Sequence, residues 1–110
     1  MEFINLTPHD VVIMERNEII KVIPASGNVA RVQTHAKAVG KLDGIEVVKT
    51  VWGDIEGLPE PKEGIVYIVS MLVGQAAKRS DVIGPDTSPD SAIRNEAGQI
   101  VGCRRFQTFA

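Results

Sequence analysis

The segment GIVYIVS, residues 64–70, is the most apolar run of the chain, and it restricts the possible folds more than any other segment. Its length and its Ile, Val and Tyr residues are typical of a buried strand. A strand that is apolar on both faces belongs in the centre of a sheet. We therefore expect the chain to build its main sheet around this segment.

The next residues, MLVGQAAKR (71–79), predict a short helix that Ser70 caps. Gly74 lowers the helix propensity, so packing must hold this helix. Helical spacing places one set of side chains toward the sheet: Met71, Leu72, Gln75 and Ala76.

The first half of the chain is expected to form short strands separated by turns. Arg16 and Asn17 predict a two-residue hairpin loop, and Gly53 predicts a kink in the last strand of this half. Residues 35–44 hold little pattern and are expected to be a loop, and the proline-rich residues 58–64 are expected to be a connection. The expected strands are FINLT (3–7), VVIME (11–15), EIIKVIP (18–24), VARVQT (29–34) and GIEVVKTVWGDIEG (44–57).

After the helix, DVIGPDTSPDSAIR (81–94) is expected to be a long polar loop. A closing hairpin follows, in which NEAG (95–98) joins SAIR to QIVGCRRFQTF. The sequence therefore predicts a single α+β, mainly β domain over residues 1–110. It has about eight short, mostly antiparallel strands and one short helix near 71–79.

Composition excludes several classes of protein. The formal net charge of −2 and the pI of about 5.6 argue against a general nucleic-acid-binding protein, which needs many phosphate contacts. Cys103 is the one cysteine, so no intrachain disulfide forms, which fits a reducing cytoplasm. The polar start MEFINLTPHD does not resemble a signal peptide, and no apolar run has the length of a membrane span.

The sequence shows no motif for catalysis, metal binding or a cofactor. Two histidines and one cysteine lie without zinc-binding spacing, and no GxxxxGK[ST] loop is present. His9 lies in TPHD, where we expect the side chains of Thr7 and Asp10 to bond to the backbone of a turn. Cys103 is expected to be buried, and Trp52 and Tyr67 either belong to the core or stack on a ligand.

The candidate ligand-binding residues are cations, carboxylates and hydroxyls near the helix and on two strands. Arginine binds phosphate or carboxylate with two hydrogen bonds, and a helix start favours anions. Asp and Thr side chains select hydroxyl groups. The alternative is a solvated loop of Asx turns with ordinary surface charges, and a helix that needs a cap whatever its function. The candidates are Ser70, Arg79, Asp81, Asp86, Thr87, Arg94, Arg31 and Arg105.

Several phrases along nearly the whole chain resemble a family of small, poorly characterised proteins of bacteria and their phages. These phrases are NLTPHDVVI, PASGNVARV, GLPEPKEGIVYIVSMLV, RSDVIGPD and RNEAGQIVGCRRF. The family has no catalytic motif, so the resemblance assigns no residue role. It implies a phage setting, in which small anti-defence "sponge" proteins bind nucleotide-derived immune signals in the host cytoplasm. Such proteins are typically homo-oligomers with ligand pockets between subunits.

Three hypotheses follow from the sequence. The first is a non-catalytic protein that binds a small anionic ligand, such as a nucleotide or ADP-ribose derivative, and sequesters it. The second is a hydrolase or transferase acting on a nucleotide or sugar, with Asp81 or Asp86 as the base and a raised carboxylate pKa in a cleft. The third is a phage structural or protein-interaction protein, which predicts an exposed apolar patch.

Overall fold

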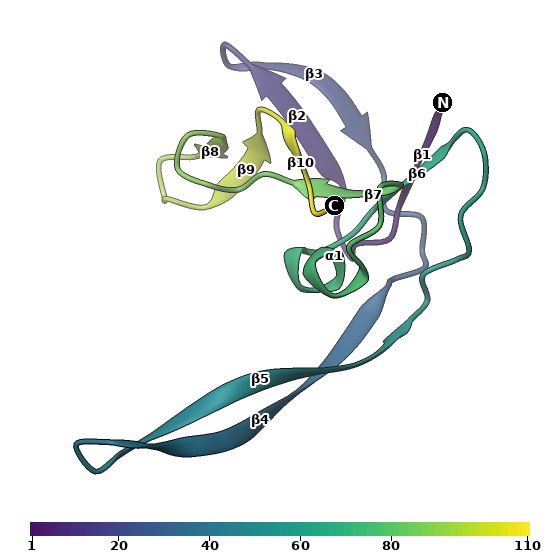
Figure 1. Cartoon of the computed structure of the whole chain (residues 1–110). Helices are drawn as coiled ribbons and strands as arrows, with labels where there is room; N and C mark the ends of the chain where they lie inside the picture. Colours follow the sequence, from purple (N-terminus) through teal and green to yellow (C-terminus); the bar gives the residue numbers. More distant parts are fainter.

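A computed structural model describes all residues, 1–110, and contains ten strands and one helix (Figure 1). The first sheet has the order β1-β6-β7-β10, formed by Glu2–Asn5, Ile65–Ile68, Val82–Pro85 and Phe106–Thr108. The second has the order β3-β2-β9-β8, formed by Glu18–Ile23, Val11–Glu15, Ile100–Cys103 and Ala92–Arg94. Strands β4 (Arg31–Leu42) and β5 (Ile45–Glu56) pair only with each other, and helix α1 spans Met71–Ala77. The expected α+β, mainly β fold is confirmed.

Strand β6 is central in the first sheet, as its apolar sequence predicts. It pairs in parallel with β1 on one side and with β7 on the other. The pair β2–β9 is also parallel, and the other four strand pairs are antiparallel. Antiparallel pairs are therefore only a narrow majority.

The first sheet separates two small cores. On one face Ile68 packs with Val11 and Ile23, which belong to the second sheet. On the other face Tyr67 and Val82 pack against helix α1 and the loops beside it. Successive strand residues point to opposite faces, so neighbours such as Tyr67 and Ile68 serve different cores. The sheet is thus apolar on both sides, which explains the continuous apolar run in β6.

Helix α1 begins as predicted but packs by a different face. The Val73 amide donates to the Ser70 hydroxyl at 3.4 Å, so the expected cap is confirmed, and Lys78 ends the helix in a left-handed conformation. Val73 and Gly74 are buried, whereas Met71 and Leu72 are 48% and 54% exposed. The expected packed face is therefore wrong. The reason is a non-local contact, since the ring of Phe109 lies directly on Gly74.

Two turns follow the sequence closely. Arg16 and Asn17 form the expected hairpin loop, with φ of 51° and 66°. In TPHD the Thr7 hydroxyl donates to the His9 carbonyl at 2.9 Å, and an Asp10 carboxylate oxygen accepts from the Ala25 amide at 2.9 Å. The structural interpretation of this His-Asp neighbour pair is confirmed.

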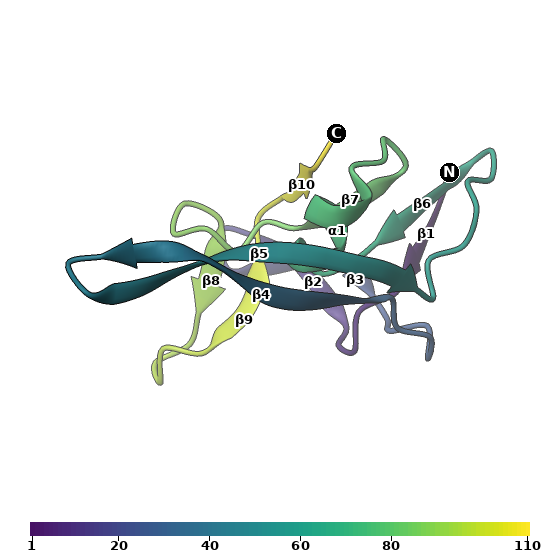
Figure 2. The same cartoon turned by 60° about the horizontal axis from the view of Figure 1, so that its bottom comes forward.

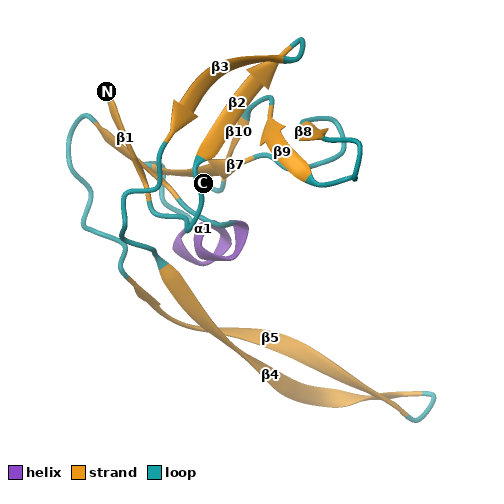
Figure 3. Cartoon of the chain, turned by 180° about the vertical axis from the view of Figure 1, so that it is seen from behind, coloured by secondary structure: helices purple, strands orange, loops and turns teal.

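The segment expected to be a loop at residues 35–44 is instead the distal part of β4, up to Leu42, and the two-residue turn after it. Together, β4 and β5 form a long hairpin, residues 31–56, which we call the arm; the rest of the chain is the body. The arm leaves the body as a separate two-stranded ribbon (Figures 2 and 3). Asp43 and Gly44 form its tip, both with positive φ. The kink expected at Gly53 coincides with a register shift between Val32 and Thr34 of β4.

The last third of the chain differs from the expected loop and from the expected length of the returning strand. Residues 81–94 are not one long loop, because they contain β7 and β8. The returning segment QIVGCRRFQTF is not one strand, because Arg104 and Arg105 lie in the bend where the chain crosses from β9 to β10. The hairpin at Asn95–Gly98 is confirmed.

The arm makes the molecule extended. The Cα radius of gyration is 16.4 Å, whereas a compact chain of this length has about 13 Å. Only 15 of the 110 residues are buried, and none lies between Arg31 and Glu56. No helix of the structure has the length and apolar character needed to cross a membrane.

Candidate functional site

Two open clefts lie on either side of a ridge formed by Thr7, Pro8 and Ser70. The first, which we call the arm-foot cleft, has a volume of about 440 Å³ and lies where the arm meets helix α1. The second, the turn cleft, has a volume of about 340 Å³ and lies between the TPHD turn and strand β9. Both volumes fall within the usual range for small-ligand sites.

The arm-foot cleft combines one cation with two carboxylates. Arg31, the first residue of β4, lies opposite Glu56, the last residue of β5. Asp54 lies two residues before Glu56 on β5 and also lines the cleft. The two ion pairs of the structure involve other residues, so the Arg31 guanidinium has no carboxylate partner. Side chains alternate between the two faces of β4 and β5. Val32 and Ile55 therefore pack on the core, whereas the neighbouring charged side chains line the cleft.

Helix α1 supplies the remaining wall of the arm-foot cleft. The Ser70 hydroxyl accepts from the Val73 amide and keeps its own proton for a further bond. Leu72 and Val73 contribute apolar surface, and Gln33 contributes an amide from the arm. The cleft can therefore bind an anion, hydroxyl groups and an apolar ring at once.

The turn cleft is lined by hydroxyl and apolar side chains. Thr87 enters it from the turn after β7, and Ile100 and Val101 expose 45% and 43% of their surface beside it. Cys103 also lies against it but is 3% exposed, and burial raises the pKa of its thiol. A buried thiol with a raised pKa is a packing group rather than a nucleophile.

The polar residues after the helix form structural contacts instead of a shared pocket. The guanidinium of Arg79 donates two hydrogen bonds to the Asp81 carboxylate, at 2.9 and 2.6 Å, and a third to the Pro59 carbonyl at 3.0 Å. This bond pattern lowers the pKa of Asp81 and raises the pKa of Arg79. Arg79 thus fixes the proline-rich connection to the end of α1.

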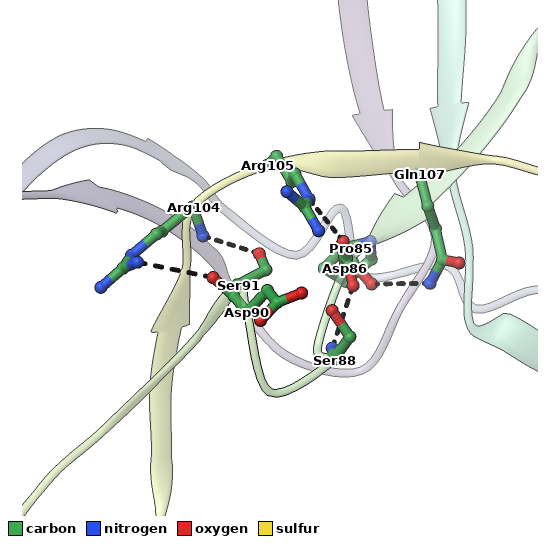
Figure 4. A network of polar contacts seen from close by, with 8 residues as sticks. All are labelled: Pro85, Asp86, Ser88, Asp90, Ser91, Arg104, Arg105 and Gln107. Carbon is green, nitrogen blue, oxygen red and sulfur yellow. Dashed lines mark hydrogen bonds and ion pairs between the residues drawn. The ribbon is translucent and has the colours of Figure 1, made fainter.

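Asp86 and Arg105 form a second pair, which joins the turn after β7 to the bend before β10 (Figure 4). The Arg105 Nε donates to Asp86 at 2.7 Å, and the Ser88 amide donates to the other carboxylate oxygen at 2.9 Å. These bonds lower the pKa of Asp86 to about 2.

Hydrogen bonds around Ser91 continue this network, because its hydroxyl accepts from the Arg104 amide at 3.0 Å. The Gln107 side chain, in β10, donates to the Pro85 carbonyl at 3.2 Å. The residues between β7 and β10 are therefore tied to one another.

The eight predicted ligand residues are thus brought together only in part. Ser70 and Arg31 line the arm-foot cleft, and Ser70 and Thr87 line the turn cleft. Arg94 lies in the far hairpin and donates to the Gly98 carbonyl at 2.6 Å. The predicted ligand residues that line neither cleft are Arg79, Asp81, Asp86, Arg94 and Arg105.

Asp54, Glu56 and Gln33 are cleft residues that sequence reasoning missed. The available signal was their position in two strands that pair with each other, which would place them beside Arg31. No three His, Cys, Asp or Glu side chains lie close enough to bind a metal ion together.

Comparison with known proteins adds no relative. No protein-family model matches this chain, and neither the curated proteins nor the solved structures include a significant match to it.

Proposed function

We propose that the chain is a non-catalytic protein that binds a small anionic ligand, a nucleotide or ADP-ribose derivative, in the arm-foot cleft. The observation that carries this proposal is the combination of an unpaired Arg31 with Asp54 and Glu56 in one cleft of about 440 Å³. Phosphate and ribose hydroxyls on one molecule require these two kinds of partner.

Each group of the cleft has a chemical role in this proposal. The Arg31 guanidinium binds a phosphate with two parallel hydrogen bonds. The carboxylates of Asp54 and Glu56 accept hydrogen bonds from ribose hydroxyls, as acidic residues do in dinucleotide sites. The Ser70 hydroxyl donates to a phosphate oxygen, and Leu72 offers apolar surface to a base.

The biological role that we propose is sequestration of a nucleotide-derived immune signal by a phage protein. Its support is the resemblance of the sequence to small proteins of bacteria and phages, and it is an argument from setting. A cleft that is open in the single chain also agrees with ligand sites that a second subunit completes.

The enzyme hypothesis loses its specific support. It named Asp81 or Asp86 as the base and required a raised carboxylate pKa in a cleft. Both carboxylates have lowered pKa values because they accept hydrogen bonds from Arg79 and Arg105, and neither lines a cleft. A carboxylate so stabilised is a poor general base.

The test is a thermal-shift titration of the full chain with ADP-ribose, and with AMP and ribose 5-phosphate as fragments. We expect ADP-ribose to raise the melting temperature, and Arg31→Ala to abolish the rise without changing the melting temperature of the free protein. Arg94→Ala, a matched removal of an exposed arginine outside the clefts, should keep the rise.

A second control separates binding from folding. Arg79→Ala should lower the melting temperature of the free protein, because it removes three hydrogen bonds, and should leave the ligand-induced rise intact. If Arg79→Ala abolished the rise and Arg31→Ala did not, the site would lie beside Arg79 instead. Mass spectrometry of the ligand released by denaturation must recover it unaltered, since an altered product would mean turnover.

A further inference from the structure

The distal arm has no support within its own chain. Between Thr34 and Trp52 the two strands pair only with each other, and most of their side chains are exposed on both faces. An isolated two-stranded hairpin is marginally stable in water. The tip exposes Leu42 and Ile45 to 72% and 70%, so apolar surface is left without a partner.

One face of the arm carries two lysines directly opposite each other. Lys37 of β4 pairs in register with Lys49 of β5, and both are exposed. Like charges at directly opposite positions destabilise a strand pair. Val47 and Val51 flank Lys49 on the same face of β5, because side chains alternate along a strand. We call this surface the lysine face.

The body carries a matching pair of the opposite sign. Glu15 of β2 lies directly opposite Glu18 of β3, and both are exposed. They line a concavity of about 410 Å³ together with Arg16 and Ile20, so the concavity has two carboxylates and one guanidinium. Ile20, its apolar lining residue, is 58% exposed. We call this surface the glutamate groove.

The two surfaces cannot meet within one chain. The β2–β3 turn and the arm lie at opposite ends of the molecule in two views (Figures 1 and 3). Each presents apolar surface beside a like-charged pair, and the charges of the two pairs are complementary. Outside the arm the chain has ten Asp and Glu against eight Lys and Arg, whereas the arm has four of each.

We infer that the arm of one copy docks by its lysine face in the glutamate groove of a second copy. Because each copy carries both surfaces, two copies arranged antiparallel satisfy both contacts at once, which closes the assembly. The distal arm is roughly 30 Å long and about 10 Å wide, or on the order of 300 Å² a face. The glutamate groove is lined by four residues and covers only part of this face, so the pair depends on both reciprocal contacts forming together.

Charge exchange tests this inference sharply. The first variant carries Lys37→Glu and Lys49→Glu, and the second carries Glu15→Lys and Glu18→Lys. In each variant alone, the arm and the groove have the same sign and repel. In a mixture, the arm of each variant meets a groove of opposite sign on the other, so both contacts are restored.

The measurement is molar mass by light scattering during gel filtration, without ligand. We expect twice the chain mass of 11.9 kDa for the natural protein, the mass of one chain for either variant, and twice that mass for their mixture. A control with Lys62→Glu and Lys78→Glu, which changes two exposed lysines outside the arm, should keep the doubled mass. Circular dichroism checks that each variant is folded.

Three results would overturn the inference. These are a natural protein that stays monomeric at high concentration, folded variants that keep the doubled mass, or folded variants that do not associate when mixed. The outcome is independent of the proposed ligand, because no step of the measurement uses one.

Discussion

Asn5 shows how one side chain organises the start of the chain. Its amide group donates to the carbonyls of His9 and Ile23, both at 2.9 Å, and its side-chain oxygen accepts from the Thr7 amide at 2.9 Å. Asn5 is 1% exposed. If its side chain were removed, water could not reach the groups that bond to it, and they would be left without a hydrogen-bond partner. Asn5 thus fixes the TPHD turn that forms the ridge between the two clefts.

Gly74 is required by packing and is not a weak point of the helix. A Cβ atom at this position would lie 2.1 Å from the Phe109 ring. We therefore expect Gly74→Ala to destabilise the fold by about 1–3 kcal/mol in urea unfolding, although alanine favours helix. In a Phe109→Ala background the same substitution should become stabilising by up to about 1 kcal/mol, because only helix propensity remains. A loss of equal size in both backgrounds would rule out the ring as the cause.

Arg105 sets the acid titration of Asp86. The pKa of Asp86 is lowered to about 2, from 3.8 for a free side chain, first by Arg105 and then by the bonds to Ser88. A lowered folded-state pKa adds stability that is complete above pH 3.8 and is lost as the pH falls through about 2.

Arg105→Gln should therefore move the pKa of Asp86 upward, toward 3.8, in an NMR titration of the carboxyl carbons. It should also reduce the loss of stability between about pH 4 and pH 2. Arg94→Gln removes an arginine that bonds only a carbonyl, and it should leave both measurements unchanged. An unmoved Asp86 titration in Arg105→Gln would assign the lowered pKa to the Ser88 bonds alone.

At the scale of elements, the sequence predicts what is buried much better than what is exposed. The strand β6 and the Ser70 cap follow from local pattern, because each is fixed by burial or by backbone bonding nearby. Residues 35–44 were expected to be a loop because AKAVGKL lacks alternation. The arm explains this, since a ribbon with both faces in solvent imposes no alternation on its sequence.

Local sequence pattern also predicts only part of the candidate site. The sequence singles out Arg31 and Ser70, but their meeting in one cleft depends on where the arm joins helix α1, which no local pattern encodes. Arg79 and Asp81 attract attention as ligand groups because they lie two residues apart beside a helix end. Their spacing allows them to bond to each other instead. Opposite charges close in sequence are therefore weak evidence for a ligand.

The distal arm should be dispensable for folding of the body. Its residues 37–49 belong to neither core, whereas Val32 and Ile55 at its foot pack on one of them. We expect a chain in which Asn-Gly replaces residues 37–49 to have a melting temperature within about 4 °C of the monomeric arm variant, a change below about 1 kcal/mol. Ile55→Ala, by contrast, should cost about 2 kcal/mol because it opens a gap in the core. A truncated chain that fails to fold would make the arm part of the folding unit.

For the whole molecule, an extended shape and a small core have one physical consequence. A radius of gyration of 16.4 Å with 15 buried residues leaves much apolar surface in water, and the partner that we propose for it is a second copy with matching charges. Association stabilises the folded state by mass action, so the melting temperature of a dimer depends on protein concentration.

We therefore expect the melting temperature of the natural protein to rise steadily with concentration in calorimetry, and that of the truncated chain to stay constant. The variant with Lys37→Glu and Lys49→Glu should also melt at a constant temperature, and an equimolar mixture with the Glu15→Lys, Glu18→Lys variant should regain the dependence. The mixture is decisive because one of its two contacts is natural and the other has both charges exchanged, so complementary charge alone restores the second contact. A rise that persisted in the truncated chain would place the contact between copies in the body, away from the arm.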